Sequence, residues 1–124
     1  MEVHGHIKFT IVKQASDEII SEMPVQPGIL NPFGTVNAGA TLWFADVTAS
    51  VLLLQGLEVE EKMQGFPLAI NLNANFLGNS RAGTFVAKSN YVKKGRSVSV
   101  VRTTVTDLDG NQIADVTTSH VPSR

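Results

Sequence analysis

One apolar segment, residues 40–55, constrains the fold of this chain more than any other feature. It contains no Gly or Pro, Gly56 follows it, and its length of about four helical turns exceeds that of an ordinary strand, so we predict a helix. Apolar side chains, Trp43 and Phe44 among them, surround this helix, which indicates that core packing covers it on nearly every side. One carboxylate, Asp46, interrupts the apolar surface at its middle.

The composition narrows the classes of protein to consider. The 124 residues, 43% of them hydrophobic, predict a single domain over 1–124 with a substantial core. Ten basic and eleven acidic residues nearly cancel, which argues against nucleic acid and anionic membranes as partners. The absence of cysteine excludes disulfides, thiolate metal sites and cysteine nucleophiles. Because we identify neither a signal peptide nor a membrane span, we expect a soluble cytoplasmic protein.

The rest of the chain shows the two-residue period of β-strands. The clearest predicted strand has an apolar face made of Leu68, Ile70, Leu72, Ala74 and Phe76. The pair Asp109-Gly110 marks a hairpin, residues 14–17 mark another, and a loop rich in Pro, Gly and Asn covers 24–34. Strands are expected at residues 7–13, 18–25, 68–76, 84–93, 97–107 and 112–121.

A single apolar helix among antiparallel strands can be covered on most sides only if the sheet curls around it. The expected fold class is therefore α+β, with a curled antiparallel sheet wrapped around one long central helix.

Several short motifs follow one another in an order typical of a known family. Asn31 lies in the loop before the helix, residues 37–39 read Asn-Ala-Gly, and residues 42–46 read Leu-Trp-Phe-Ala-Asp. After the helix, residues 75–83 read Asn-Phe-Leu-Gly-Asn-Ser-Arg-Ala-Gly. In order and spacing these motifs resemble those of the hotdog-fold acyl-CoA thioesterases, especially the branch of the phenylacetate-degradation and 4-hydroxybenzoyl-CoA thioesterases. The resemblance runs from about residue 18 to the end and implies the hotdog fold.

Three positions depart from the family pattern. Asn37 and Ala38 stand where the family has His and Gly, and residues 78–80 replace an Arg-Pro-Gly sequence. A backbone N–H at position 38 does not need glycine unless φ is positive or the ligand approaches closely. The lost His normally shapes the site, and the lost Arg is a basic contact to coenzyme A, although Arg81 stands nearby.

The resemblance implies catalytic roles for four residues. Asp46 would act as general base on water or as nucleophile toward the thioester carbonyl. The backbone amide of Ala38, with that of Gly39, would form the oxyanion hole at the helix N-terminus. Asn31 would orient water or the carbonyl. From the residues alone, other interpretations stay open: Asp46 bonds a backbone group or an interface partner, Asn37 is an ordinary helix cap, and Asn31 is a turn residue.

Spacing along the helix has a consequence for assembly. Ala38 and Asp46 are eight residues apart, about 12 Å along a helix, which is too far for both to reach one reacting carbon. If both are catalytic, two helices must run antiparallel across a two-fold axis so that each site combines two chains. We therefore expect a homodimer, or a homotetramer built as a dimer of dimers.

Other polar residues are candidates for substrate binding. Ser50 lies four residues after Asp46 on the same helical face, and Gln64 precedes the strand from which the family often draws a polar residue. Basic residues near turns are candidates for the phosphates of coenzyme A, with a solvated turn as the alternative. The substrate-binding candidates are Asn37, Ser50, Gln64, Arg81, Lys93, Lys94 and Arg96.

The histidines, His4, His6 and His120, lie near the chain ends, and we expect them away from the loop and the helix. This placement argues against hotdog dehydratase and hydratase chemistry, which uses a His with an acid. No closed set of metal ligands is evident, so we expect no metal and no cofactor beyond the coenzyme A of the substrate.

The predicted function is an acyl-CoA thioesterase that hydrolyses an acyl or aroyl thioester to free acid and coenzyme A. A hotdog protein that binds an acyl-CoA or another apolar ligand without turnover is the alternative. A third hypothesis is a structural domain in which Asp46 fixes the register of a dimer.

Overall fold

The computed structural model describes residues 2, 4–55 and 67–122. It consists of one long helix and six strands, with a short 3-10 turn, η1, at Pro27–Ile29 before the helix. The helix, α1, spans Ala38–Leu53. The strands are β1 (Thr10–Gln14), β2 (Glu18–Pro24), β3 (Pro67–Phe76), β4 (Thr84–Lys93), β5 (Ser99–Asp107) and β6 (Gln112–Pro122).

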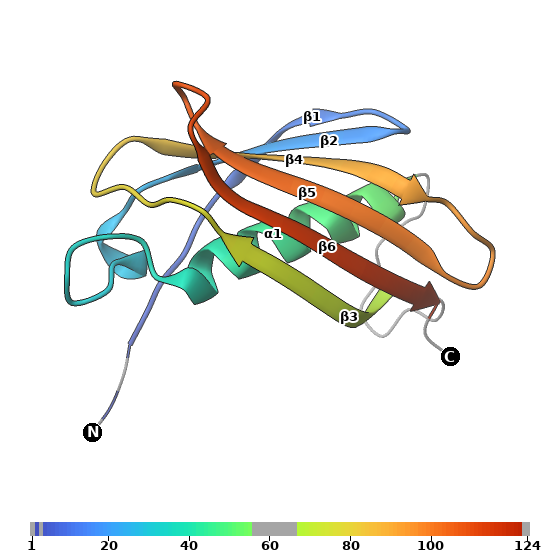
Figure 1. The fold of residues 1–124 in the computed structure, drawn as a ribbon, viewed down its shortest axis with the longest axis horizontal. Helices are drawn as coiled ribbons and strands as arrows, with labels where there is room; N and C mark the ends of the chain where they lie inside the picture. The colour runs from blue at the N-terminus through green and yellow to red at the C-terminus, as the bar shows by residue number, and fades with distance from the viewer. Residues whose placement is uncertain (1, 3, 56–66, 123–124) are drawn as a thin grey trace.

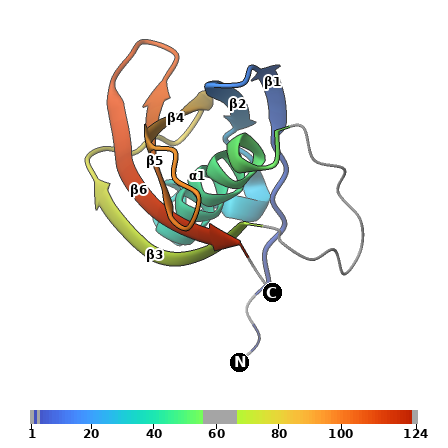
Figure 2. The same cartoon turned by 90° about the vertical axis from the view of Figure 1, so that its right-hand side faces the viewer.

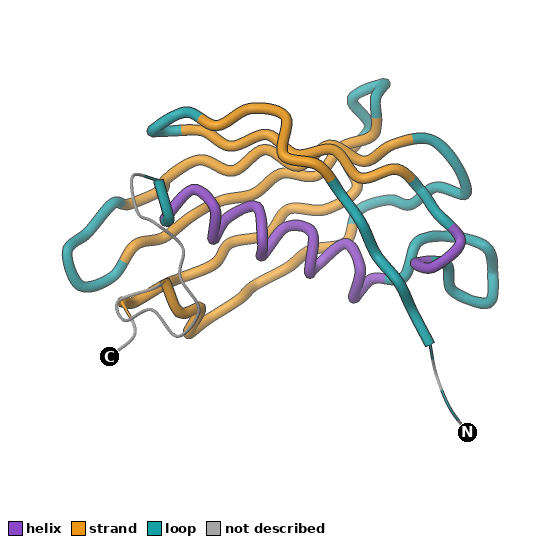
Figure 3. Tube along the Cα trace, turned by 180° about the vertical axis from the view of Figure 1, so that it is seen from behind, coloured by secondary structure: helices purple, strands orange, loops and turns teal. Residues whose placement is uncertain are grey.

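All six strands belong to one antiparallel sheet with the order β1-β2-β4-β5-β6-β3. The sheet curls around α1, which lies along its concave side (Figures 1 and 2). β1 and β3 form the two edges, and the N-terminal segment crosses in front of the helix between them (Figure 3). This arrangement confirms the predicted α+β class and the hotdog fold.

The predicted elements agree with the structure within a few residues. The first strand begins at Thr10 rather than at residue 7, because the preceding segment leaves the sheet and Phe9 packs edge-on against Trp43 and Phe44. The helix begins two residues earlier than predicted, since Asn37 caps it. Gly110, with φ of 85°, forms the predicted hairpin turn between β5 and β6. Gly56 and Gln64 lie outside the described residues.

The core lies between the concave face of the sheet and one side of α1. Phe44 from the helix and Phe85 from β4 are its largest buried side chains, and burying each contributes about 1.5–3 kcal/mol. The expectation of a helix covered on nearly every side was wrong for a single chain. Trp43 is 42% exposed, because the sheet covers one side of α1 and the N-terminal segment covers only part of the other.

The expected alternation along β3 was also wrong at one end. The register between β3 and β6 shifts between Ala69 and Asn71, so Ile70 is an extra residue in the strand. Directly opposed residues of an antiparallel pair project to the same side, so Leu68 shares the side of its partner Val121 rather than that of Leu72. The alternation of apolar residues in a sequence does not reveal a bulge, because a bulge depends on the pairing with the neighbouring strand.

Candidate active site

The N-terminus of α1 leaves one backbone amide available. Asn37 caps the helix: its Oδ1 accepts from the Gly39 N–H at 2.8 Å, and its carbonyl accepts from Ala40 and Thr41. Among the described residues, the Ala38 N–H has no hydrogen-bond partner. Of the two amides expected to form the oxyanion hole, that of Ala38 is therefore free and that of Gly39 is occupied by the cap. An unpaired N–H at a helix N-terminus is suited to bind developing negative charge.

The loop before α1 is held by two asparagines. Asn31 accepts hydrogen bonds at Oδ1 from Phe33 and Thr35, and its Nδ2 donates to the Thr35 hydroxyl at 2.8 Å. Asn79 from the β3–β4 connection bonds both the N–H and the carbonyl of Val36, at 3.1 and 2.9 Å. The hydrogen bonds of Asn31 are thus those of a turn residue. Sequence reasoning missed Asn79, whose amide pairs with a backbone as a peptide group does.

A hollow of about 660 Å³ lies beside the start of the helix. Asn31, Asn37 and Gly39 line it together with Trp43, so these predicted site residues do gather in space. The expectation that the histidines lie away from this loop was wrong for His4 and His6. Both line the same hollow, because the N-terminal segment runs beside η1 and the backbone of His6 bonds Gly28 at 3.2 Å.

Asp46 lies halfway along α1, on the flank directed away from the centre of the core. Its Oδ1 is buried and has no hydrogen-bond partner among the described residues. Leaving such an oxygen unpaired costs about 1–3 kcal/mol, and more when the group is charged, so Asp46 is not placed there for stability alone. The Ser50 hydroxyl bonds the Asp46 carbonyl at 3.0 Å rather than the carboxylate.

His120, on β6, is the titratable group beside Asp46 that sequence reasoning misplaced. It lies near the C-terminus in sequence, yet β6 is paired with both β5 and β3, and His120 is only 2% exposed. Nε2 is 2.8 Å from the hydroxyl of buried Thr118, while Nδ1 has no partner among the described residues. Burial lowers the pKa of His120, and the negative charge of Asp46 partly offsets this lowering.

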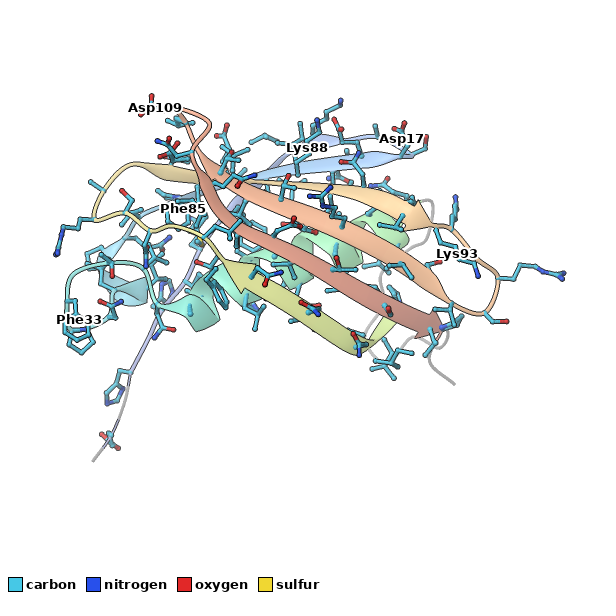
Figure 4. The ribbon with its side chains drawn as sticks, in the orientation of Figure 1. Asp17, Phe33, Phe85, Lys88, Lys93 and Asp109 are labelled. Carbon is cyan, nitrogen blue, oxygen red and sulfur yellow. The ribbon has the colours of Figure 1, made fainter. Side chains whose placement is uncertain are left out.

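The basic candidates separate into two groups at opposite ends of the molecule. Lys94 and Arg96 follow β4 and border a cavity of about 230 Å³ with Tyr91 and His120. Arg81 lies at the other end, where its guanidinium donates to the Phe33 carbonyl. Figure 4 shows this separation through the labelled residues Lys93 and Phe33.

Within one chain, the candidate oxyanion hole and the candidate catalytic carboxylate are therefore too far apart to act on one substrate carbon. The free amide of Ala38 is at one end of α1, and the Asp46 carboxylate is about 12 Å further along it. Among residues 2, 4–55 and 67–122, no group of three or more His, Asp or Glu side chains is placed to hold a metal ion. No helix in this described part is long and apolar enough to cross a membrane.

Comparisons with known proteins agree with this geometry. The model of the Thioesterase superfamily matches residues 33–114, which is more than half of the chain and includes Ala38 and Asp46. A 1,4-dihydroxy-2-naphthoyl-CoA hydrolase of Listeria monocytogenes is 26% identical over 107 residues, which cover 86% of this chain and 84% of the relative.

Solved structures share the fold. A thioesterase from Haemophilus influenzae superposes with a TM-score of 0.84 at 21% identity, covering 94% of this chain and 79% of that one. A Streptococcus mutans protein solved with acetyl-CoA also has a TM-score of 0.84, at 19% identity, with 98% and 94% of the two chains covered. The chain belongs to the thioesterase superfamily and is a thioester hydrolase.

Proposed function

We propose that this protein is an acyl-CoA thioesterase that hydrolyses an acyl or aroyl thioester to the free acid and coenzyme A. The observation that carries the proposal is the Asp46 carboxylate, which is placed within an apolar helix with one oxygen buried and unpaired. Relatives support the substrate class: one acts on an aroyl-CoA, and one structural neighbour was solved with acetyl-CoA.

The proposed enzyme is a homodimer, or a homotetramer made of two such dimers, because a single chain cannot bring Ala38 to Asp46. The edge strand β3 supports this assembly. Its residues Leu68, Ile70 and Phe76 are each about half exposed, and the strand contains no charged residue. Pairing of β3 with β3 of a second copy around a two-fold axis makes the two copies of α1 antiparallel. Asp46 of each chain then approaches the N-terminus of the partner's helix.

In the proposed mechanism, the N–H of Ala38 in one chain binds the thioester oxygen as negative charge develops on it. Asp46 of the other chain removes a proton from a water molecule, whose oxygen adds to the carbonyl carbon. Collapse of the tetrahedral intermediate breaks the carbon–sulfur bond, and the proton passes to the departing thiolate. Direct attack by the carboxylate, followed by hydrolysis of the anhydride, uses the same two groups.

The antiparallel arrangement of the helices would also bring the two groups of basic residues close together. In such a dimer, one end of the first chain adjoins the end of the partner at which the partner's helix begins. The first chain contributes Lys93, Lys94 and Arg96 there, and the partner contributes its Arg81. We propose that these side chains bind the phosphates of coenzyme A. Asn31, Asn37, Gly39, Ser50 and Gln64 remain proposed contacts to the thioester or to the attacking water.

A second candidate function is an acyl-CoA binding protein without turnover. The observation in its favour is that Asn37 replaces a histidine and that its carboxamide oxygen is occupied by the Gly39 amide. Such a protein retains coenzyme A thioesters and releases no thiol. The absence of a metal and of any further cofactor, a single domain and a cytoplasmic location remain predictions.

Complementation between two inactive variants tests the proposal. Asp46→Ala removes the base, and we expect kcat to fall about 10³-fold. Ala38→Pro removes one N–H, yet proline is well tolerated at the first helical position, and Asn37 already has an extended backbone with ψ of 132°. In a mixture refolded together, half of the dimers are mixed and each contains one intact site, so about a quarter of wild-type thiol release returns.

Each variant mixed with itself is the control and stays inactive. Thiol release from a panel of acyl-CoAs is measured with a thiol reagent, and dimer formation is checked by light scattering. A mixture that dimerises but remains as inactive as its components would refute a site shared between chains. Tight binding of acyl-CoA by the wild-type protein without thiol release would establish the second candidate function instead.

A further inference from the structure

We propose that His120 is a positioning residue for Asp46: its Nδ1–H donates to Oδ1 of the carboxylate, and Thr118 holds the ring in the tautomer that allows this. The inference rests on the proposed function, in which Asp46 acts on the thioester. It assigns a role to a buried histidine that the mechanism above does not use.

The fold places the two side chains on facing surfaces. β6 is an interior strand of the sheet, and the residues directly opposed to His120 are Ser99 on β5 and Ala69 on β3. Both neighbours are small, so the imidazole is the largest group of this row on the concave face. Leu53, which lies two turns after Asp46 on the same flank of α1, borders a cavity together with His120. That flank therefore runs along His120.

The hydrogen bond to Thr118 determines which nitrogen of the His120 ring carries the proton. The Thr118 hydroxyl is fully buried, and its contact with Nε2 at 2.8 Å is the one hydrogen bond of that side chain among the described residues. If the hydroxyl donates to Nε2, the ring proton lies on Nδ1, which becomes a donor. The other tautomer leaves the hydroxyl proton without an acceptor and directs a lone pair of Nδ1 toward a carboxylate.

The two unpaired atoms are complementary. Nδ1 of His120 and Oδ1 of Asp46 are the two buried side-chain atoms without a partner in the described part of the chain. One is a donor in the selected tautomer, and the other is an acceptor. A buried donor and a buried acceptor on facing surfaces gain by pairing, since each otherwise bears its desolvation cost alone.

Surrounding charges favour a neutral ring. Asp46 is the one titratable residue of α1, and β3 supplies none. The titratable residue on the concave side of β5, Asp107, lies at the opposite end of that strand from Ser99, the partner of His120. Among the described residues, the charged side chains that border the cavity next to His120 are those of Lys94 and Arg96, and both are cations. Burial lowers the pKa of His120 below its ordinary value of 6.5 despite the opposing effect of Asp46. A neutral imidazole donates one hydrogen bond and keeps the carboxylate available as a base.

The proposed hydrogen bond has a consequence for the reaction. It occupies Oδ1 and fixes the rotation of the carboxylate about its Cβ–Cγ bond. Oδ2 is then directed toward the water that attacks the thioester. Supporting contacts of this kind typically change activity 10- to 100-fold, because a catalytic group held in the wrong orientation reacts slowly.

Nitrogen NMR of the full-length protein tests the pair without any substrate. We expect His120 to show the Nδ1–H tautomer and a pKa below its ordinary value of 6.5. Asp46→Asn removes the negative charge, so the pKa of His120 falls further. Thr118→Val, which has a similar shape, shifts the ring toward the Nε2–H tautomer. A wild-type ring with the proton on Nε2, or a His120 signal indifferent to Asp46→Asn, would overturn the inference.

A matched pair of substitutions tests its effect on catalysis. His120→Asn places a donor close to the position of Nδ1, whereas His120→Gln places its amide near Nε2. We expect kcat of His120→Gln to fall at least about tenfold with little change in KM, and His120→Asn to retain most of the activity. In an Asp46→Ala background neither substitution lowers kcat further.

Failure of the inference and failure of the proposed function give different results. If the wild-type protein hydrolyses acyl-CoAs and both His120 variants match it, the inference alone is wrong. If the wild-type protein releases no thiol, the proposed function is wrong, and the NMR measurements still decide whether His120 and Asp46 are paired. Circular dichroism spectra of the variants show whether a loss of activity reflects unfolding.

Discussion

The two edges of the sheet differ in length and in charge. β1 is five residues long, is bulged at Val12, and presents Lys13, whose ammonium lies 2.8 Å from Glu18. β3 is ten residues long, is uncharged, and leaves Ile70 55% exposed. Short length, a bulge and a lysine are devices by which natural edge strands avoid pairing with other chains.

This comparison indicates which edge would bind the second copy in the proposed homodimer. β3 is also bulged, at Ile70, but its register with β6 is regular from Asn71 to Phe76. An uncharged edge with exposed apolar residues is a liability unless a partner covers it. The edge formed by β1 is protected, and the edge formed by β3 is suited to the dimer that we propose.

The largest expected effect comes from a charge placed on β3. Ile70→Lys introduces a cation at an exposed position, so the monomer folds while pairing of two β3 strands becomes unfavourable. We expect a monomer in sedimentation experiments and an activity at least about 100-fold lower, since Asp46 no longer meets Ala38 of the partner. Val12→Lys, at a position 51% exposed on β1, is the matched control and retains both properties. If the Ile70→Lys variant remains dimeric and active, the dimer interface does not include β3.

An intermediate effect concerns acid stability at the β1 edge. The Lys13 ammonium, with help from Asn90 and Lys88, lowers the pKa of the Glu18 carboxyl from 4.5 to about 2. Because the folded-state pKa is lowered, the stabilisation is complete above about pH 4.5 and is lost as the pH falls through about 2. Hydrogen exchange of β1 and β2 amides should accelerate in that window relative to β3 and β6. In Glu18→Gln this pH dependence disappears; if it persists, another carboxylate is responsible.

The smallest expected effect comes from making β1 resemble β3. Lys13→Val removes the charge from the protected edge and raises its tendency to form strands. We expect unchanged thioesterase activity and a small rise in species larger than the wild-type assembly, by light scattering at high protein concentration. Lys88→Val on interior strand β4 controls for the general loss of a positive charge. Equal association of both variants would show that edge position is not the cause.

Local patterns predicted the elements of the fold well. The apolar run around Phe44 predicted the helix within two residues at each end, and Asp109-Gly110 predicted its hairpin. The loop residue Asn31 could be interpreted in two ways, and its hydrogen bonds support the turn without testing the catalytic alternative. The bulge at Ile70 escaped prediction because it depends on how β3 pairs with β6.

The candidate site was predictable to a smaller degree. Asp46 was identifiable because a lone carboxylate in an apolar helix is costly, and Asn37 because it is a favoured cap. The histidines were misplaced because distance along the chain says little about distance in a curled sheet. His120 lies at the far end of the sequence from Asp46, yet β6 brings it to the helix.

The sequence alone determined the helix, the strands, the helix cap and the presence of a costly carboxylate, Asp46, in an apolar helix. These features depend on residues only a few positions apart. Tertiary structure alone decided which edge remains open, which amide at the helix start is free, and that Thr118 and His120 line the wall facing Asp46. Those features arise when strands distant in sequence pair, and pairing energies depend on the whole sheet rather than on any one segment.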